Sequence, residues 1–214
     1  TSGNSHAVIN LVGSALVGLR FGEHELIPET DLGPKVFAGT LLTPWPNRIQ
    51  NGTYQFEGKQ YQLEIRDGKG NALHGMVDEQ RADVVESRTG YAKLETFLVA
   101  SEGYPANLKV ESVFELSATE LTVSYQVTNQ GPGNAPVGIG THPYFLYTDS
   151  TKIEINAKTA AVHDGQMIPI GEVQASELGL GPGRASLVSN LKLDTQFGQL
   201  GDPVATVTND EFAY

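Results

Sequence analysis

Residues 121–127, Leu-Thr-Val-Ser-Tyr-Gln-Val, alternate apolar and polar side chains without interruption. Because successive side chains of a β-strand point to opposite faces, this alternation places the apolar side chains on one face of a strand. Residues 15–21 and 61–65 follow the same alternation, and patterns typical of helices are nearly absent. The sequence therefore predicts an all-β protein.

Turn signals separate these predicted strands at short intervals. Asn51-Gly52 lies between Ile49 and Phe56, and this dipeptide favours a hairpin because both residues accept positive φ. Glu57-Gly58-Lys59 predicts a second turn. Stretches rich in Gly and Pro at 130–134 and 179–184 are typical of the corners of an antiparallel sheet. No shift in composition divides the chain, so residues 1–214 are expected to form a single domain.

Composition and missing motifs exclude several classes of function. The chain has 214 residues, with 14 Lys and Arg against 25 Asp and Glu, and the resulting net charge of −11 would repel nucleic acid. No apolar run is long enough to span a membrane. The absence of cysteine excludes disulfides and Cys nucleophiles. Neither a phosphate-binding loop, a G-x-S-x-G motif nor a metal-ligand spacing occurs, so we expect no metal and no cofactor.

Two of the five histidines stand in settings that favour chemistry. His74 precedes Gly75, a residue that permits close backbone approach to a ligand. His142 is followed by Pro143 and the rings of Tyr144 and Phe145, which could form a wall for a sugar. An imidazole suits proton transfer at neutral pH. For either histidine, a purely structural role is the alternative.

Two further residues are candidates for ligand contacts. Arg48 follows Pro44-Trp45-Pro46-Asn47, where two prolines restrict the backbone, and its guanidinium fork matches neighbouring hydroxyls or an anionic group. The alternative is an Arg that extends over Trp45. Asp194 stands between largely apolar residues, where a buried carboxylate would need donors such as ligand hydroxyls, whereas a turn Asp is the commoner case.

Five motifs together resemble the aldose 1-epimerase (galactose mutarotase) family. They are Trp45–Ile49, Gly52–Gly58, Asn71–Gly75, Gly103–Pro105 and Gly140–Phe145, which follow the order and approximate spacing of that family. The resemblance runs from about Val8 to Asp194. The motif Pro-Trp-Pro-Asn-Arg is similar to the corresponding motif in a bacterial branch of the family. It implies a galactose mutarotase-like supersandwich, a large twisted antiparallel β-sandwich with a sugar cleft.

The resemblance also implies an activity and roles for these residues. Such enzymes interconvert the α and β anomers of a free hexose such as galactose or glucose by acid/base ring opening, without a cofactor or metal. His142 matches the general acid and His74 the second histidine, which hydrogen-bonds the sugar. Arg48 and Asp194 match the residues that hold sugar hydroxyls, and their neighbours Asn47 and Tyr144 are further candidates for substrate contact. We expect a monosaccharide partner and a cytoplasmic location; the oligomeric state does not follow from the sequence.

One part of the family pattern is not matched. The general base of the family is a Glu in a strand near the C-terminus, and the surroundings of Glu211 do not resemble that motif. Residues 204–208 predict a strand, 209–210 a turn, and 211–214 the start of another strand. We therefore expect a chain that lacks the C-terminal strands of the family. The alternatives are a short relative that binds carbohydrate without turnover, or an epimerase of a phosphorylated or sulfonated sugar.

Overall fold

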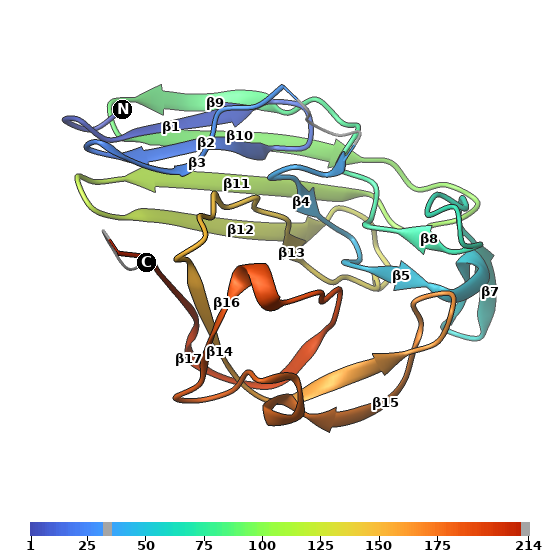
Figure 1. The fold of residues 1–214 in the computed structure, drawn as a ribbon. Coiled ribbons are helices and arrows are strands. Elements are labelled where there is room, and N and C mark those ends of the chain that lie inside the picture. The colour runs from blue at the N-terminus through green and yellow to red at the C-terminus, as the bar shows by residue number, and fades with distance from the viewer. Residues whose placement is uncertain (32–35, 211–214) are drawn as a thin grey trace. The chain divides into compact units, whose positions relative to one another are not determined.

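The structure, a computed structural model, describes residues 1–31 and 36–210 and contains two compact units, Thr1–Leu146 and Tyr147–Tyr214 (Figure 1). Strands form nearly all of the regular structure in both units, which confirms the predicted all-β class. Short 3₁₀ turns lie between the strands, among them η2 (Gln50–Gly52), η3 (Ala175–Leu178) and η4 (Val188–Asn190).

Two antiparallel sheets form one end of the first unit and lie side by side in Figure 1. One sheet is β1 (His6–Asn10), β2 (Ala15–Phe21) and β3 (His24–Ile27), and the other has the order β12 (Leu121–Asn129), β11 (Leu108–Leu116), β10 (Tyr91–Leu98) and β9 (Asp83–Arg88). Ile9 and Leu16 of the first sheet pack against Leu94 and Phe114 of the second. The two sheets therefore pack against each other. The contact from β2 comes from Leu16, on the strand face opposite to the alternating residues Ala15, Val17 and Leu19, which are buried as well.

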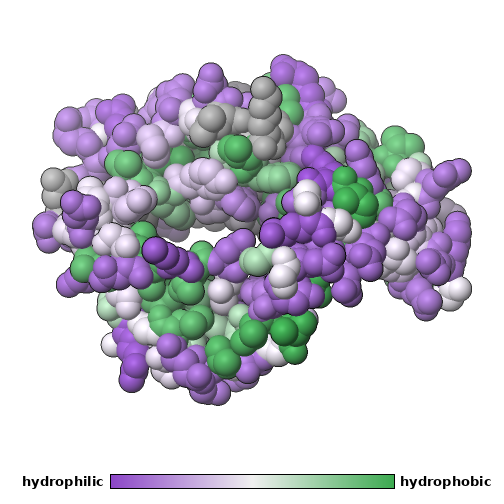
Figure 2. Space-filling model, turned by 45° about the vertical axis from the view of Figure 1, so that its right-hand side comes forward, coloured by the Kyte–Doolittle hydropathy of each residue, from purple (hydrophilic) through white to green (hydrophobic). Residues whose placement is uncertain are grey.

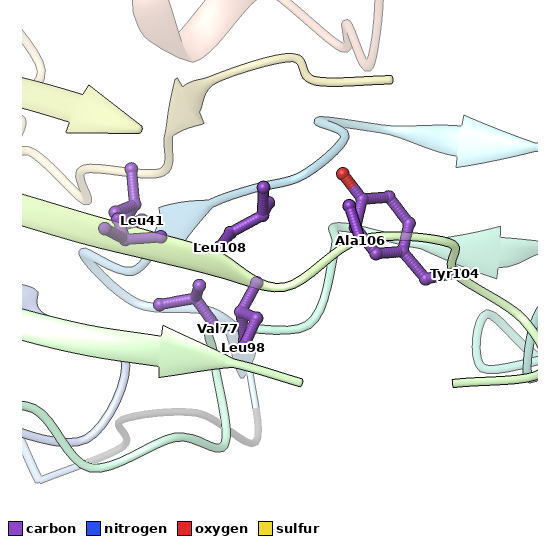
Figure 3. Packing of buried hydrophobic residues seen from close by; sticks show 7 residues of the cluster. Leu41, Val77, Leu98, Tyr104, Ala106 and Leu108 are labelled. Atoms are coloured by element: carbon purple, nitrogen blue, oxygen red, sulfur yellow. The ribbon is translucent and has the colours of Figure 1, made fainter. Parts of the chain in front are cut away.

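A second apolar cluster connects the larger sheet to the segments that carry the candidate residues. Its buried members include Leu41, Val77, Tyr104 and Leu108 (Figure 3), and Trp45 packs against it. Burial of a side chain of this size contributes about 1.5–3 kcal/mol to stability. The Tyr104 hydroxyl donates to the carbonyl of Pro136 at 2.8 Å, so its buried polar group is satisfied.

Three short strand pairs complete the first unit. They are β4 (Leu41–Leu42) with β13 (Gly140–Thr141), β5 (Arg48–Ile49) with β8 (Ala72–Leu73), and β6 (Thr53–Phe56) with β7 (Lys59–Gln62). The hairpin predicted at Asn51-Gly52 is wrong, because β5 pairs with β8 and not with β6. Both residues do adopt positive φ, 55° and 64°, but they turn the chain between strands of different pairs.

The other local predictions vary in accuracy. The strands at 15–21 and 121–127 are confirmed as β2 and β12. The predicted turn at Glu57-Gly58 is confirmed, since it joins β6 to β7 with φ of 49° and 77°. The alternation over 61–65 was misleading: β7 ends at Gln62 and the side chain of Ile65 is 45% exposed.

The second unit is built around one long strand. β14 (Lys152–His163) pairs with β15 (Pro169–Gln174), β16 (Ala185–Leu187) and β17 (Phe197–Thr208). The strand predicted at 204–208 lies within β17. Glu211 and the strand predicted at 211–214 lie outside the described residues.

Hydrophilic side chains cover much of the face shown in Figure 2, with small hydrophobic groups between them. This distribution agrees with a chain of net charge −11. Among residues 1–31 and 36–210, no helix has both the length and the apolar character needed to cross a bilayer.

Candidate active site

His74 and His142, which lie far apart in the sequence, are brought together at the ends of two short strands. His74 follows β8 and His142 follows β13. Their ring centroids are 5.3 Å apart and the ring planes meet at 75°. The fold thus places side by side the two imidazoles that the sequence singled out.

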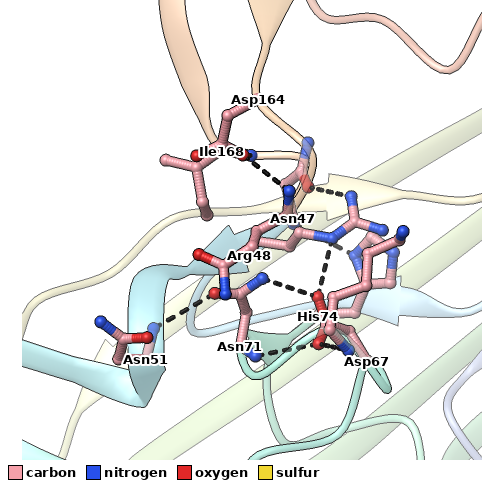
Figure 4. Close-up of polar contacts among 10 residues, drawn as sticks. Asn47, Arg48, Asn51, Asp67, Asn71, His74, Asp164 and Ile168 are labelled. Carbon is pink, nitrogen blue, oxygen red and sulfur yellow. Dashed lines mark hydrogen bonds and ion pairs between the residues drawn. The ribbon is translucent and has the colours of Figure 1, made fainter.

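Hydrogen bonds to Asn47 orient the ring of His74 (Figure 4). The backbone N–H of Asn47 donates to Nδ1 of His74 at 3.1 Å, and the backbone N–H of His74 donates to the Asn47 carbonyl at 3.0 Å. A backbone N–H can only donate, so Nδ1 carries a lone pair and the proton of the neutral ring is on Nε2. His74 is therefore set up to offer Nε2–H as a hydrogen-bond donor.

Gly75 allows the chain to turn away directly after His74. It has a φ of 83°, and a Cβ atom at this position would lie 2.2 Å from the carbonyl oxygen of Thr43. Gly75 thus approaches the backbone of Thr43 closely, whereas the close approach to a ligand stays a prediction. Glycine is required here because any side chain would displace the segment that carries His74.

The backbone of His142 is fixed by the segment that precedes β4. Its N–H donates to the Thr40 carbonyl at 3.2 Å, and its own carbonyl accepts from the Gly39 N–H at 2.8 Å. The ring of Tyr144 lies 5.2 Å from that of His142, and the Tyr144 hydroxyl donates to the Val36 carbonyl at 2.8 Å. Tyr144 is 41% exposed, so an aromatic surface lies beside His142 as predicted.

Arg48 is anchored by a carboxylate that sequence reasoning missed. Its Nε donates to Oδ2 of Asp67 at 3.0 Å, and the Asp67 side chain is only 1% exposed. Nη1 of Arg48 also donates to the side-chain oxygen of Asn47 at 3.3 Å. Arg48 is therefore held by Asp67 (Figure 4), in contrast to the alternative of an Arg extended over Trp45.

Asp67 is held as an anion by a dense set of donors. The backbone N–H groups of Lys69 and Asn71 donate to Oδ1 at 2.8 and 2.9 Å, and the Asn71 amide donates to Oδ2 at 2.9 Å. Burial alone would raise the pKa of Asp67, but the hydrogen bonds from Asn71, Lys69 and Arg48 outweigh it and lower the pKa to about 2. The turn composition of residues 67–71 was the available sequence signal for this carboxylate.

Asp194 belongs to the second unit, unlike the other candidates. It lies in the segment 191–196 between η4 and β17, outside any strand, and its side chain is exposed. The structure therefore groups His74, His142, Arg48, Asn47 and Tyr144 within the first unit, and leaves the role of Asp194 as a prediction from the resemblance. In the part of the chain that is described, no three His, Asp or Glu side chains are grouped to hold a metal ion.

Comparison with known sequences and structures identifies the family to which the chain belongs. The model of the family described as aldose 1-epimerase matches residues 1–208. The chain belongs to the aldose 1-epimerase family. This match spans both compact units and includes every candidate residue named above, so the resemblance inferred from the five motifs is confirmed.

This member of the aldose 1-epimerase family covers different shares of the length of its relatives. YihR of Escherichia coli K12, described as uncharacterized, is 33% identical over 209 residues, which make up 94% of this chain and 68% of YihR. The galactose mutarotase of Bos taurus is 32% identical over 149 residues, which make up 64% of this chain but only 42% of the bovine protein. The chain thus matches less than half the length of that enzyme.

A solved structure confirms the predicted fold. The GalM/aldose epimerase homologue of Caenorhabditis elegans superposes with a TM-score of 0.83 at 18% identity, over 96% of this chain and 72% of that one. The galactose 1-epimerase of Lactobacillus acidophilus gives a TM-score of 0.79 at 17% identity, over 96% and 70% of the two chains. The fold is that of the galactose mutarotase-like β-sandwich proteins.

Proposed function

We propose that this member of the aldose 1-epimerase family interconverts the α and β anomers of a free hexose such as galactose or glucose at the His74–His142 pair. The observation that carries the proposal is the placement of two imidazoles 5.3 Å apart, one of which is oriented by Asn47 to present Nε2–H. Two adjacent groups that can donate a proton or a hydrogen bond suit the oxygen atoms around an anomeric carbon.

In the proposed reaction, His142 gives a proton to the ring oxygen while a base removes the proton of the C1 hydroxyl. The bond between C1 and the ring oxygen breaks, and an open-chain aldehyde forms. Rotation about the C1–C2 bond presents the other face of the aldehyde, and closure reverses both proton transfers. Nε2–H of His74 would hold the sugar through the oxygens near C1. None of the described residues is assigned as the base.

The remaining candidates are proposed to bind the sugar or to orient the residues that bind it. The Arg48 fork, fixed through Nε by Asp67, would donate to ring hydroxyls with its terminal nitrogens. Tyr144 would offer an aromatic surface to the sugar beside His142. Asn47 would act through the orientation of His74 and Arg48, and Asp194 would accept from sugar hydroxyls. The cytoplasmic location stays a prediction.

Polarimetry of freshly dissolved α-galactose and α-glucose tests the proposal, with heat-treated protein as the control. The proposal predicts faster decay of the optical rotation wherever the general base accompanies His142, because an oriented general acid typically contributes about 10²–10⁴-fold to such a rate. Calorimetric titration with the same sugars separates the alternative. Binding without acceleration would overturn the enzymatic proposal in favour of a carbohydrate-binding module.

A further inference from the structure

Phe37, which the sequence did not single out, contacts both imidazoles of the candidate site. Its ring centroid lies 4.7 Å from that of His74 at an interplanar angle of 69°, and 6.5 Å from that of His142 at 42°. The edge-to-face contact with His74 has the geometry that aromatic pairs prefer. One side chain from a third segment therefore touches both groups that the proposed reaction uses.

The backbone of Phe37 is held in an unusual conformation. Its φ is 57°, in the left-handed region that bulky residues rarely adopt. The Phe37 carbonyl accepts from the Thr40 N–H at 3.1 Å and from the Thr40 hydroxyl at 2.5 Å, and Thr40 is fully buried. Because the same Thr40 accepts from the His142 N–H, the positions of Phe37 and His142 are linked through one residue.

The Arg66–Asp78 ion pair contacts the ring of Phe37 through the guanidinium group of Arg66. The guanidinium carbon of Arg66 lies 5.7 Å from the ring centroid, within the range of a cation–π contact. Arg66 is itself fixed by a two-point pair with Asp78, at 3.1 and 2.6 Å, and the Asp78 side chain is 0% exposed. A buried carboxylate that aims an arginine at an aromatic ring makes the position of that ring well defined.

The residue before Phe37 contributes a third link to the site. The Val36 carbonyl accepts the hydroxyl proton of Tyr144 at 2.8 Å. The two-residue segment Val36-Phe37 thus contacts three of the candidate residues, namely His74, His142 and Tyr144. Phe37 is only partly buried, so burial of apolar surface alone does not account for its strained backbone and its fixed ring.

We propose that Phe37, held by the Arg66–Asp78 pair, is a positioning residue that sets the angle and spacing of the His74 and His142 imidazoles. The proposal rests on the proposed function, and deepens it. A misplacement of reacting groups by about 1 Å can cost on the order of 10²-fold in rate. Phe37 would therefore act through the imidazoles, with a larger effect on turnover than on sugar binding.

Kinetics of three variants test this role. Phe37→Leu should lower kcat for mutarotation by on the order of 10–100-fold while KM stays close to that of the native chain. Phe37→Tyr keeps the ring and should retain most of the rate. Phe97→Leu is the matched control, since Phe97 is exposed on β10. A Phe37→Leu variant that is folded and has the native kcat would overturn the proposal, as would a loss confined to KM.

A spectroscopic measurement keeps the test independent of turnover. In protein with ¹⁵N-labelled histidine, Phe37→Leu and the unbranched Phe37→Met should each shift the ring signals of both His74 and His142, and leave those of the exposed His24 in place. Arg66→Gln should move the same signals in a folded chain. Unchanged signals of either site imidazole in a folded Phe37 variant would refute the positioning role, even if the native chain does not accelerate mutarotation.

Discussion

Asn47 and His74 are joined by a reciprocal pair of hydrogen bonds, from the Asn47 N–H to His74 Nδ1 at 3.1 Å and from the His74 N–H to the Asn47 carbonyl at 3.0 Å. Both residues have positive φ, 62° and 63°. Because Asn47 directly precedes Arg48, one short segment fixes both the tautomer of His74, a candidate hydrogen-bond donor to the sugar, and the backbone position of Arg48, a candidate sugar-binding residue.

Asp67 is expected to stabilise the folded chain through its ionised form. Asp67→Asn removes the anion that accepts from Arg48, Lys69 and Asn71. A pKa lowered from 3.8 to about 2 corresponds to on the order of 2 kcal/mol of stability at neutral pH. Urea unfolding at pH 7 measures this loss, and the exposed Asp83→Asn serves as the control. Equal stability of the two variants would contradict the role of Asp67.

The low pKa of Asp67 predicts that the free energy of unfolding depends on pH in the acid range. The folded-state pKa of Asp67 lies below its ordinary value, so its contribution is complete above about pH 4 and is lost as the pH falls toward 2. The difference in unfolding free energy between the native chain and Asp67→Asn should therefore shrink over this window. A difference that stays constant from pH 5 to about pH 2.5 would show that ionisation of Asp67 is not its source.

Arg48→Lys should weaken sugar binding while the charge is kept. Lysine lacks the planar fork, so it cannot bond Asp67 through one nitrogen and ring hydroxyls through others. We expect Kd and KM for galactose to rise by on the order of tenfold, in line with the loss of one charged hydrogen bond. Arg20→Lys at an exposed position of β2 is the control. Native affinity in Arg48→Lys would remove Arg48 from the site.

Gly75→Ala should destabilise the chain more than a matched glycine variant. Both Gly75 and Gly58 have positive φ, 83° and 77°, but a Cβ meets the Thr43 carbonyl at 2.2 Å only at Gly75, and nothing within 4 Å at Gly58. The difference in Tm between Gly75→Ala and Gly58→Ala therefore measures the steric clash separately from the strain of placing an alanine at positive φ, which both variants share. Equal melting temperatures would mean that the segment before Met76 adjusts freely.

The pattern of apolar and polar residues predicted the strands that have long, regular alternation. It did not predict which strands pair when the partners lie far apart in the sequence. Residues 121–127 form most of β12 because their apolar side chains have a sheet to pack against. Asn51-Gly52 has the chemistry of a hairpin turn, yet the preceding strand pairs with Ala72–Leu73. Turn residues determine the direction of the chain locally, whereas the partner of a two-residue strand depends on tertiary contacts.

The candidate site was predictable where a motif marks it and not where packing creates it. His74, His142 and Arg48 carry recognisable neighbours in the sequence, and the fold brings them into one unit. The neighbours of Asp67 indicate only a turn, and its importance comes from its ion pair with Arg48. Phe37 has no recognisable neighbours, and its importance comes from ring contacts with His74 and His142, which are 37 and more than 100 residues away in the chain. Such contacts can be seen only in three dimensions.

The rate of mutarotation in His142→Asn tests the central claim most directly. The asparagine keeps a polar side chain of similar size but cannot deliver a proton to the ring oxygen. With freshly dissolved α-galactose, we expect the enzymatic rate to fall by at least about 10²-fold relative to the native chain, while the exposed His24→Asn retains it. A folded His142→Asn variant that turns over galactose at the native rate would contradict the assignment of this histidine as the general acid.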